Sequence, residues 1–244
     1  MDALWWTILA VILPLILTAL AYAFHFLTAK GALAAFAFAA FIGVTGGFWW
    51  ELAFLAMPAA SFAATKVDFR EKKAEGVQEG KRGERSWKNI AGVSVAPALV
   101  AALFFFAPAR YEVALIVAFI SAIAVSTADT VASEIGVADP HVWMITTLKP
   151  TTVGTNGGVS RAGLLSSLVA ALAFAFVAWV LIAHNVKMPF VVAGLAGMAG
   201  NLLDSILGAT LENHGYISKY VNNSVTALCG ALLGGAIAAV FWPI

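Results

Sequence analysis

The chain has 244 residues, of which 61% are hydrophobic and only 11% are charged. Its mean hydropathy of +0.91 excludes an ordinary soluble domain. A formal net charge of +1 gives no basic surface for nucleic acid, and we expect no nucleic-acid partner. The composition predicts an all-α integral membrane protein, a polytopic transmembrane helical bundle in a lipid bilayer.

Apolar stretches of about the 20 residues that cross a bilayer follow one another along the chain. The stretch 31–65 is long for one span and short for two, but Gly43, Gly46 and Gly47 are typical of a tight turn between two short helices. We therefore expect seven or eight spans, with eight favoured, in one membrane domain over residues 1–244. The other expected spans are 4–27, 90–107, 111–131, 163–183, 189–210 and 222–242.

Eight of the fourteen lysine and arginine residues lie between Lys66 and Lys88. Basic residues in short loops mark the cytoplasmic side, so the loop 66–88 is expected inside. Two spans separate it from the motif loop 132–162, and two more separate that loop from 211–221. The three connections should therefore share one face, which predicts a site on the cytoplasmic face of the membrane.

Two expected spans carry acidic residues on their polar stripes. Asp at the centre of a membrane helix costs about 2.5–3.5 kcal/mol on insertion scales, so intramembrane carboxylates are expected to be functional. Two polar stripes can be buried only against each other or against a wet cavity. We expect Asp129, Glu134 and Asp204 to be catalytic and to bind Mg2+. Glu212 lies one turn beyond the stripe of Asn201, Asp204, Ser205 and Gly208.

A glycine-rich segment lies between these two spans. Glycines let backbone N–H groups approach an anion, and Ser160 is expected to cap a helix whose positive end favours phosphate. A plain turn would use similar residues, but the position between Asp129 and Asp204 favours a nucleotide triphosphate. Arg82 and Arg85 could fold over a phosphate, or belong to a solvated helical hairpin. The predicted phosphate-binding set is Lys149, Gly154, Thr155, Asn156, Gly157, Gly158, Ser160, Arg161 and Asn201.

Taken together, these motifs resemble the DUF92 membrane proteins, a family that includes a plant phytyl phosphate kinase and the animal transmembrane protein 19. Val131 stands where relatives commonly have Trp. The resemblance adds Asn222 and Asn223 to the predicted nucleotide-binding set. It lies in K-x-x-G-x-x-E-x-x-R-G-x-R from Lys73, ADTVASEIG from Ala128, GTNGGVS from Gly154, DSILGATLE from Asp204, and the asparagine pair.

The chain is also distantly similar to the dolichol and phytol kinases, which use CTP. The resemblance implies transfer of the gamma-phosphoryl group of CTP, or another nucleotide, to an isoprenyl monophosphate. We expect the isoprenyl tail to contact apolar walls at Phe104–Phe106 or along 194–200. A lipid cytidylyltransferase and a membrane transporter stay open as alternatives, and a homo-oligomer is compatible with the sequence. The matching residues are Asp129, Ala132, Gly136, Lys149, Pro150 and Gly154.

Overall fold

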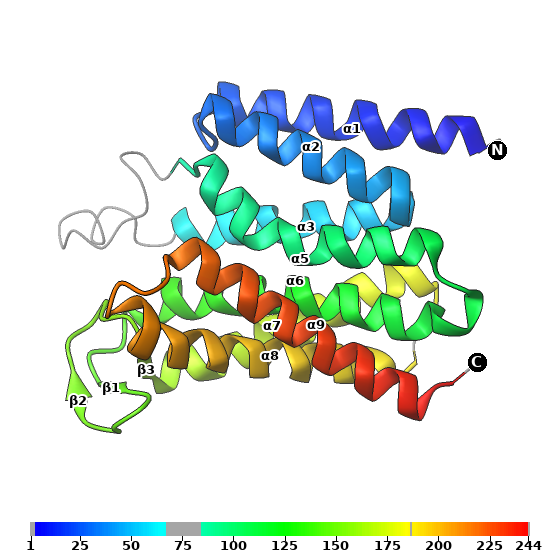
Figure 1. The fold of residues 1–244 in the computed structure, drawn as a ribbon. Helices are drawn as coiled ribbons and strands as arrows, with labels where there is room; N and C mark the ends of the chain where they lie inside the picture. Colours follow the sequence, from blue (N-terminus) through cyan, green and yellow to red (C-terminus); the bar gives the residue numbers. More distant parts are fainter. Residues whose placement is uncertain (1–2, 67–83, 186, 244) are drawn as a thin grey trace.

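The computed structural model describes residues 3–66, 84–185 and 187–243 (Figure 1). Long helices run back and forth between the two ends of the molecule. A 3-10 turn, η1 (Ala109–Tyr111), precedes α6, and a π-helical turn, η2 (Gly208–Glu212), extends α8. The long helices are α1 (Ala3–Ala23), α2 (Ala29–Gly46), α3 (Phe48–Lys66), α5 (Trp87–Phe106), α6 (Glu112–Gly136), α7 (Arg161–Ala183), α8 (Pro189–Leu207) and α9 (Lys219–Phe241).

Seven of the described helical segments are long and apolar enough to cross a membrane. They are α1, α2, α5, α7, α9, α6 with η1, and α8 with η2. The expected turn after Gly46 is confirmed, because Gly47 separates α2 from α3. Helix α3 carries Glu51 and is not among the seven. The membrane helical bundle is confirmed, whereas the favoured count of eight spans stays a prediction.

The connections that carry the sequence motifs lie together at one end of the bundle, here called the site end. Figure 1 shows there the β-strands between α6 and α7, the connection from α8 to α9, and the turn from α1 to α2. Both ends of the chain lie at the opposite end. The shared face is thus confirmed for the connections 132–162 and 211–221, while its assignment to the cytoplasm stays a prediction.

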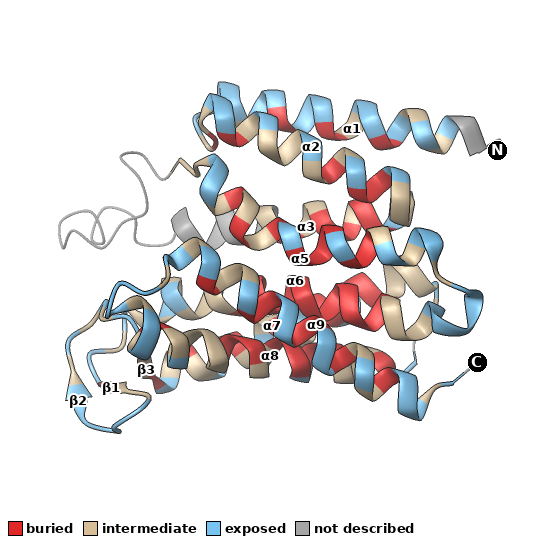
Figure 2. Cartoon of the chain, viewed as in Figure 1, coloured by how far each residue is buried: buried red, intermediate tan, exposed pale blue. Residues whose placement is uncertain are grey.

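Helix α6 forms the centre of the bundle, with α3, α5, α7, α8 and α9 packed around it (Figure 2). Every residue from Ile116 to Ala128 is buried. A Cβ added at Gly197 would lie 2.5 Å from the Ala124 Cβ, and one at Gly200 would lie 2.3 Å from a Val125 methyl. Helix packing therefore fills the glycine side of the 194–200 segment, so its glycines leave no open groove, while Leu195 on another side is 52% exposed; contact of this segment with an isoprenyl tail stays a prediction.

The motif loop contains a small antiparallel sheet that the all-α expectation did not include. Its strands are β1 (Val142–Met144), β2 (Pro150–Thr151) and β3 (Gly158–Ser160), in the order β2-β1-β3. Val142 pairs with both Thr151 and Ser160. Runs of two or three residues are too short to show a strand periodicity in the sequence. The sheet turns the chain back, so that the loop between β2 and β3 reaches η2.

Candidate functional site

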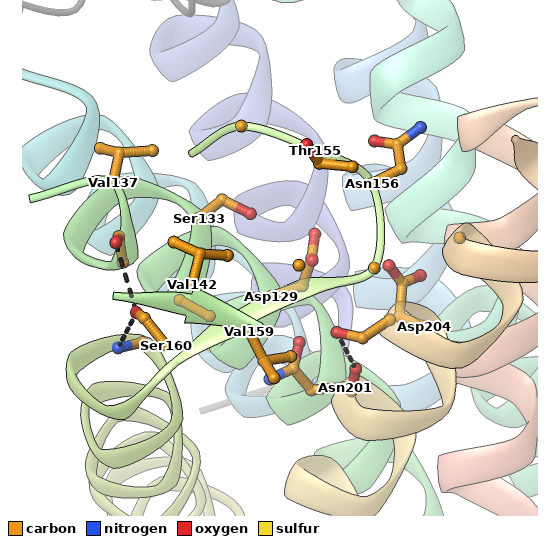
Figure 3. A pocket seen from close by; sticks show the side chains of 18 of the residues that line it. Asp129, Ser133, Val137, Val142, Thr155, Asn156, Val159, Ser160, Asn201 and Asp204 are labelled. Carbon is orange, nitrogen blue, oxygen red and sulfur yellow. Dashed lines mark hydrogen bonds between the residues drawn. The ribbon is translucent and has the colours of Figure 1, made fainter. Parts of the chain in front are cut away.

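A cavity of about 400 Å³ lies at the site end, between α6, α8 and the loop that joins β2 to β3. Figure 3 shows the carboxylates of Asp129 and Asp204 pointing into it from two helices, with Thr155 and Asn156 across from them. The structure thus brings most of the predicted site together. The predicted residues that line the cavity are Asp129, Glu134, Gly154, Thr155, Asn156, Gly157, Gly158, Ser160, Asn201 and Asp204.

The two carboxylates at the end of α8 accept hydrogen bonds from neighbouring elements. The Thr226 hydroxyl donates to Asp204 Oδ1 at 3.1 Å. Glu212 accepts from the side-chain amide of Asn156 at 2.9 Å and from that of Asn222 at 3.4 Å. Glu212 ends the π-helical turn η2, a geometry found often at functional sites. The donors fix the Glu212 carboxylate, which was not part of the predicted catalytic and metal-binding set, at the rim of the cavity.

The glycine loop rests directly on η2, and this contact requires a glycine at position 157. Gly157 has φ +78°, and a Cβ there would lie 2.4 Å from the Ala209 Cβ. The Asn213 side chain donates to the Asn156 carbonyl at 3.2 Å, which ties the loop to the α8–α9 connection. The loop thus closes one wall of the cavity, and its binding of phosphate stays a prediction.

The two basic side chains of the motif loop that were predicted to bind phosphate lie outside the cavity. Lys149 is exposed where β1 turns into β2, and Arg161 is exposed with its guanidinium 5.8 Å from the Trp143 ring centre. Neither residue lines the cavity. Strand pairing sets the direction of these side chains, and the sequence did not reveal that pairing. This corrects the predicted cradle of Lys149 and Arg161.

Arg85, the described member of the predicted arginine lid, does not line the cavity. The Arg85 backbone pairs with Phe26 and Thr28 at the α1–α2 turn, with N···O distances of 2.9 and 3.1 Å. Arg82 lies outside the described residues. Lys219 is instead the basic side chain that lines the cavity within the described part of the chain. The sequence analysis missed it, although Lys219 is the sole lysine or arginine after Lys187.

The side chains of the two neighbouring asparagines, Asn222 and Asn223, lie on different sides of α9. Asn222 is 1% exposed and also donates to the Asp204 carbonyl at 3.1 Å, while its own Oδ1 is buried without a hydrogen-bond partner. Asn223 faces α5, where a Cβ added at Gly92 would lie 3.7 Å from its Cβ. Consecutive helical residues point about 100° apart, which separates the two asparagine side chains. Asn222 positions the acidic residues, and the prediction for Asn223 is corrected.

The helix α7 begins as expected but offers fewer donors than predicted. Ser160 caps it, accepting from the Gly163 N–H at 3.1 Å. The Asp139 carboxylate accepts from the N–H groups of His141 at 3.0 Å and Ala162 at 3.3 Å, and these bonds lower the pKa of Asp139. Two N–H groups of the first turn are therefore occupied. Asp139 was missed, although Asp before Pro is a turn signal.

The predicted three-carboxylate metal site does not form. Among the described residues, no three His, Cys, Asp or Glu side chains form a group that could hold a metal ion. Glu134 follows Asp129 by five residues, which places it about 140° away around α6. Asp129 and Glu212 both act electrostatically on Asp204. Because Mg2+ is usually held by one or two carboxylates together with substrate phosphates, the pair Asp129 and Asp204 fits it chemically.

The cavity also has an apolar side, formed by residues of the motif loop and α7. The predicted tail wall at Phe104–Phe106 is wrong, because α5 ends there at the opposite end of the bundle and Phe104 packs against Trp50 at 4.4 Å between ring centres. Apolar and acidic surfaces meet in the cavity itself. The apolar lining residues are Val137, Val142, Val153, Val159 and Leu164.

Comparison with known proteins identifies the family. The family model described as integral membrane protein DUF92 matches residues 12–239. The chain belongs to the DUF92 family. The uncharacterized membrane protein sll0875 of Synechocystis is 31% identical over 183 residues, which cover 72% of this chain and 69% of that protein. No solved structure matches the chain.

Two plant members of the DUF92 family are also similar to the chain. The chloroplastic protein VTE6 of Arabidopsis thaliana is 33% identical over 181 residues, which cover 72% of this chain and 53% of VTE6. This chain thus corresponds to about half the length of VTE6. Protein PGR of the same plant is 31% identical over 211 residues, which cover 78% of this chain and 73% of PGR.

Proposed function

We propose that the protein is a membrane-embedded kinase that transfers the gamma-phosphoryl group of CTP, or of another nucleoside triphosphate, to an isoprenyl monophosphate. The proposed acceptors are isoprenyl monophosphates such as phytyl phosphate and geranylgeranyl phosphate, and the product is the corresponding diphosphate. Membership of a family that resembles the phytyl phosphate kinases supports this proposal. The active site would lie on the cytoplasmic face.

The observation that carries the proposal is the cavity in which Asp129 and Asp204 meet a backbone loop rich in glycine. Transfer of a phosphoryl group requires positioning and charge neutralisation rather than covalent chemistry by the protein. The acidic half of the cavity suits a cation-bound triphosphate. The valine-rich half suits the first carbons of a lipid phosphate.

The reaction needs no strong general base. An oxygen of the lipid monophosphate is already deprotonated at neutral pH, so it can form the new bond to the gamma-phosphorus directly. The bond from that phosphorus to the beta–gamma bridging oxygen breaks, and CDP leaves. In this scheme the Gly154–Gly158 backbone orients the triphosphate, and Lys219 stabilises charge on the phosphates.

A divalent cation follows from the charges of the cavity. Asp129, Asp204 and Glu212 would repel a triphosphate and a lipid phosphate that arrived without a counter-charge. Mg2+ bound with the nucleotide would neutralise this charge, and Asp129 and Asp204 are the residues that would hold it. Thr226 orients the Asp204 carboxylate for that role through its hydrogen bond, and Asn222 holds the main-chain carbonyl of the same residue.

The packing of α6 argues against a transporter. A transport route needs polar groups through the middle of the membrane, whereas α6 fills the bundle centre with a buried run that is mainly apolar, from Ile116 to Ala128. The polar lining is confined to the site end. A lipid cytidylyltransferase would use the same cavity, with attack on the alpha-phosphorus.

Position-specific labelling tests the proposal. Purified protein in detergent would be mixed with geranylgeranyl phosphate, Mg2+ and CTP labelled at either the alpha- or the gamma-phosphate. We expect the gamma label in a lipid diphosphate, together with CDP. The alpha label in the lipid, with release of pyrophosphate, would establish a cytidylyltransferase instead. No transfer from CTP, UTP, GTP or ATP would overturn the enzymatic proposal.

A further inference from the structure

The short connection between η2 and α9 holds two stacked aromatic rings beside the cavity. His214 and Tyr216 lie with their ring planes 10° apart and their centres 6.0 Å apart. Tyr216 is 76% exposed, so a large part of its ring remains open to solvent. Aromatic rings at membrane interfaces are common, so the position of this pair decides whether it has a further role.

The connection is tied to the cavity at both of its ends. Glu212, immediately before it, and Lys219, immediately after it, both line the cavity. Asn213 donates to the Asn156 carbonyl of the glycine loop at 3.2 Å. Figure 1 shows the connection in orange next to the strand β3. The ring pair therefore lies in a short connection with a cavity-lining residue on each side, although the two rings do not themselves line the cavity.

Local hydrogen bonds fix the backbone that carries the ring pair. The Tyr216 N–H donates to the Leu211 carbonyl at 2.9 Å, and the Gly215 N–H donates to the Glu212 carbonyl at 2.8 Å. The His214 ring nitrogen Nδ1 contacts the Thr210 carbonyl. A ring carried on a fixed backbone loses less freedom when a second ring stacks on it than a ring on a mobile segment, which favours stacking.

From these observations we propose that Tyr216, backed by His214, is the stacking platform for the base of the nucleotide whose phosphates enter the cavity. This inference rests on the proposed function. Stacking accepts every base, because each has a π-face. It predicts that the enzyme discriminates weakly among the four nucleoside triphosphates, since selection by hydrogen bonds to the base edge is not part of this platform.

The test compares a ligand that has a base with one that has none. In Tyr216→Ala, the KM for CTP should rise about tenfold or more, which is the range of base stacking on aromatic residues. Inhibition by Mg2+-tripolyphosphate, which carries the phosphates without the base, should be unchanged. Tyr216→Phe should retain the wild-type KM. Tyr22→Ala is the matched control, because Tyr22 is 52% exposed at the end of α1, at the same end of the bundle, and neither it nor the α1–α2 turn lines the cavity.

The possible results separate the two proposals. Absence of phosphoryl transfer by the wild-type protein would overturn the kinase proposal. Wild-type transfer with an unchanged KM for CTP in Tyr216→Ala overturns the platform and leaves the kinase in place. An equal weakening of CTP and tripolyphosphate also overturns the platform, because it would mean that the substitution disturbs the phosphate site. An increase of the same size in the KM for CTP in Tyr22→Ala would indicate a general interfacial effect and would also contradict the stacking platform.

Discussion

Acidic side chains lie among the helices at both ends of the bundle, and their surroundings differ. At the site end, Asp204 and Glu212 accept hydrogen bonds and border a cavity. At the opposite end, Glu51 is 0% exposed in the first turn of α3, and neither of its carboxyl oxygens has a hydrogen-bond partner. A Cβ added at Gly43 would lie 2.5 Å from Glu51 Oε2, so α2 covers this carboxyl closely.

The difference shows that an acidic residue within a membrane bundle is not by itself a sign of a site. Donors from several elements, a cavity and a backbone loop suited to anions accompany the carboxylates of α6 and α8. Glu51 has none of the hydrogen bonds that stabilise a buried carboxyl group. We therefore expect function to depend on the first group and to be largely independent of Glu51.

The largest expected effect is loss of turnover in Asp204→Asn and Asp129→Asn. Each change removes a charge from the cavity while keeping the side-chain shape, so phosphoryl transfer should fall at least about a hundredfold. The thermal unfolding temperature should stay close to that of the wild type. Near-normal transfer in both variants would rule out the mechanism.

The second-largest loss of transfer is expected where the glycine loop contacts η2. Gly157→Ala would place a methyl group 2.4 Å from the Ala209 Cβ, and the resulting shift of the loop should reduce transfer by up to about a hundredfold. Gly215→Ala is the matched control, because Gly215 has φ +75° but nothing within 4 Å. Both variants carry similar backbone strain, of about 1–2 kcal/mol. Equal activity in the two would show that the contact with Ala209 is unimportant.

A smaller effect, on stability, is expected at Glu51. Glu51→Leu removes a buried polar group without partners and should raise the free energy of unfolding by about 1–3 kcal/mol. Transfer should be unchanged. Denaturation in detergent and the transfer assay measure the two properties separately. A Glu51→Leu protein that is folded but inactive would mean that the opposite end also takes part in function.

The smallest effect is expected at Asp139, on the exposed side of the site end. Its folded-state pKa is lowered by the His141 and Ala162 N–H groups, so its contribution to stability is present above the unfolded pKa of about 3.9 and is lost as pH falls through the lower folded value. Asp139→Asn should melt below the wild type at pH 7, and the difference should shrink in acid. A difference that is constant with pH would contradict this assignment.

The helices and their polar stripes could be predicted because both depend on local periodicity. Asp129, Asn201 and Asp204 lie where that periodicity places them, and Ser160 caps α7 as expected. The directions of Lys149 and Arg161 depend on the pairing of strands of two or three residues, which leave no periodic signal. The count of spans depends on α3, whose apolar run is interrupted by Glu51.

Two other features of the site could not be predicted, for different physical reasons: which of the two neighbouring asparagines faces the acidic residues, and the π-helical turn. Asn222 and Asn223 are equivalent in sequence, and only the packing of α9 against α5 and α8 shows which one faces the acidic residues. Lys219 could have been found, because it is the sole lysine or arginine that follows the DSILGATLE motif. The π-helical turn that ends at Glu212 has no signature in its composition.

The most direct test of the account measures gamma-phosphoryl transfer from CTP to geranylgeranyl phosphate by the wild type, Asp204→Asn and Glu51→Gln, side by side in one bilayer preparation. Both substitutions replace a carboxyl by an amide inside the bundle, one at each end. The account predicts transfer close to that of the wild type for Glu51→Gln and almost none for Asp204→Asn. The reverse order, or equal losses in the two variants, would contradict the assignment of function to the site end.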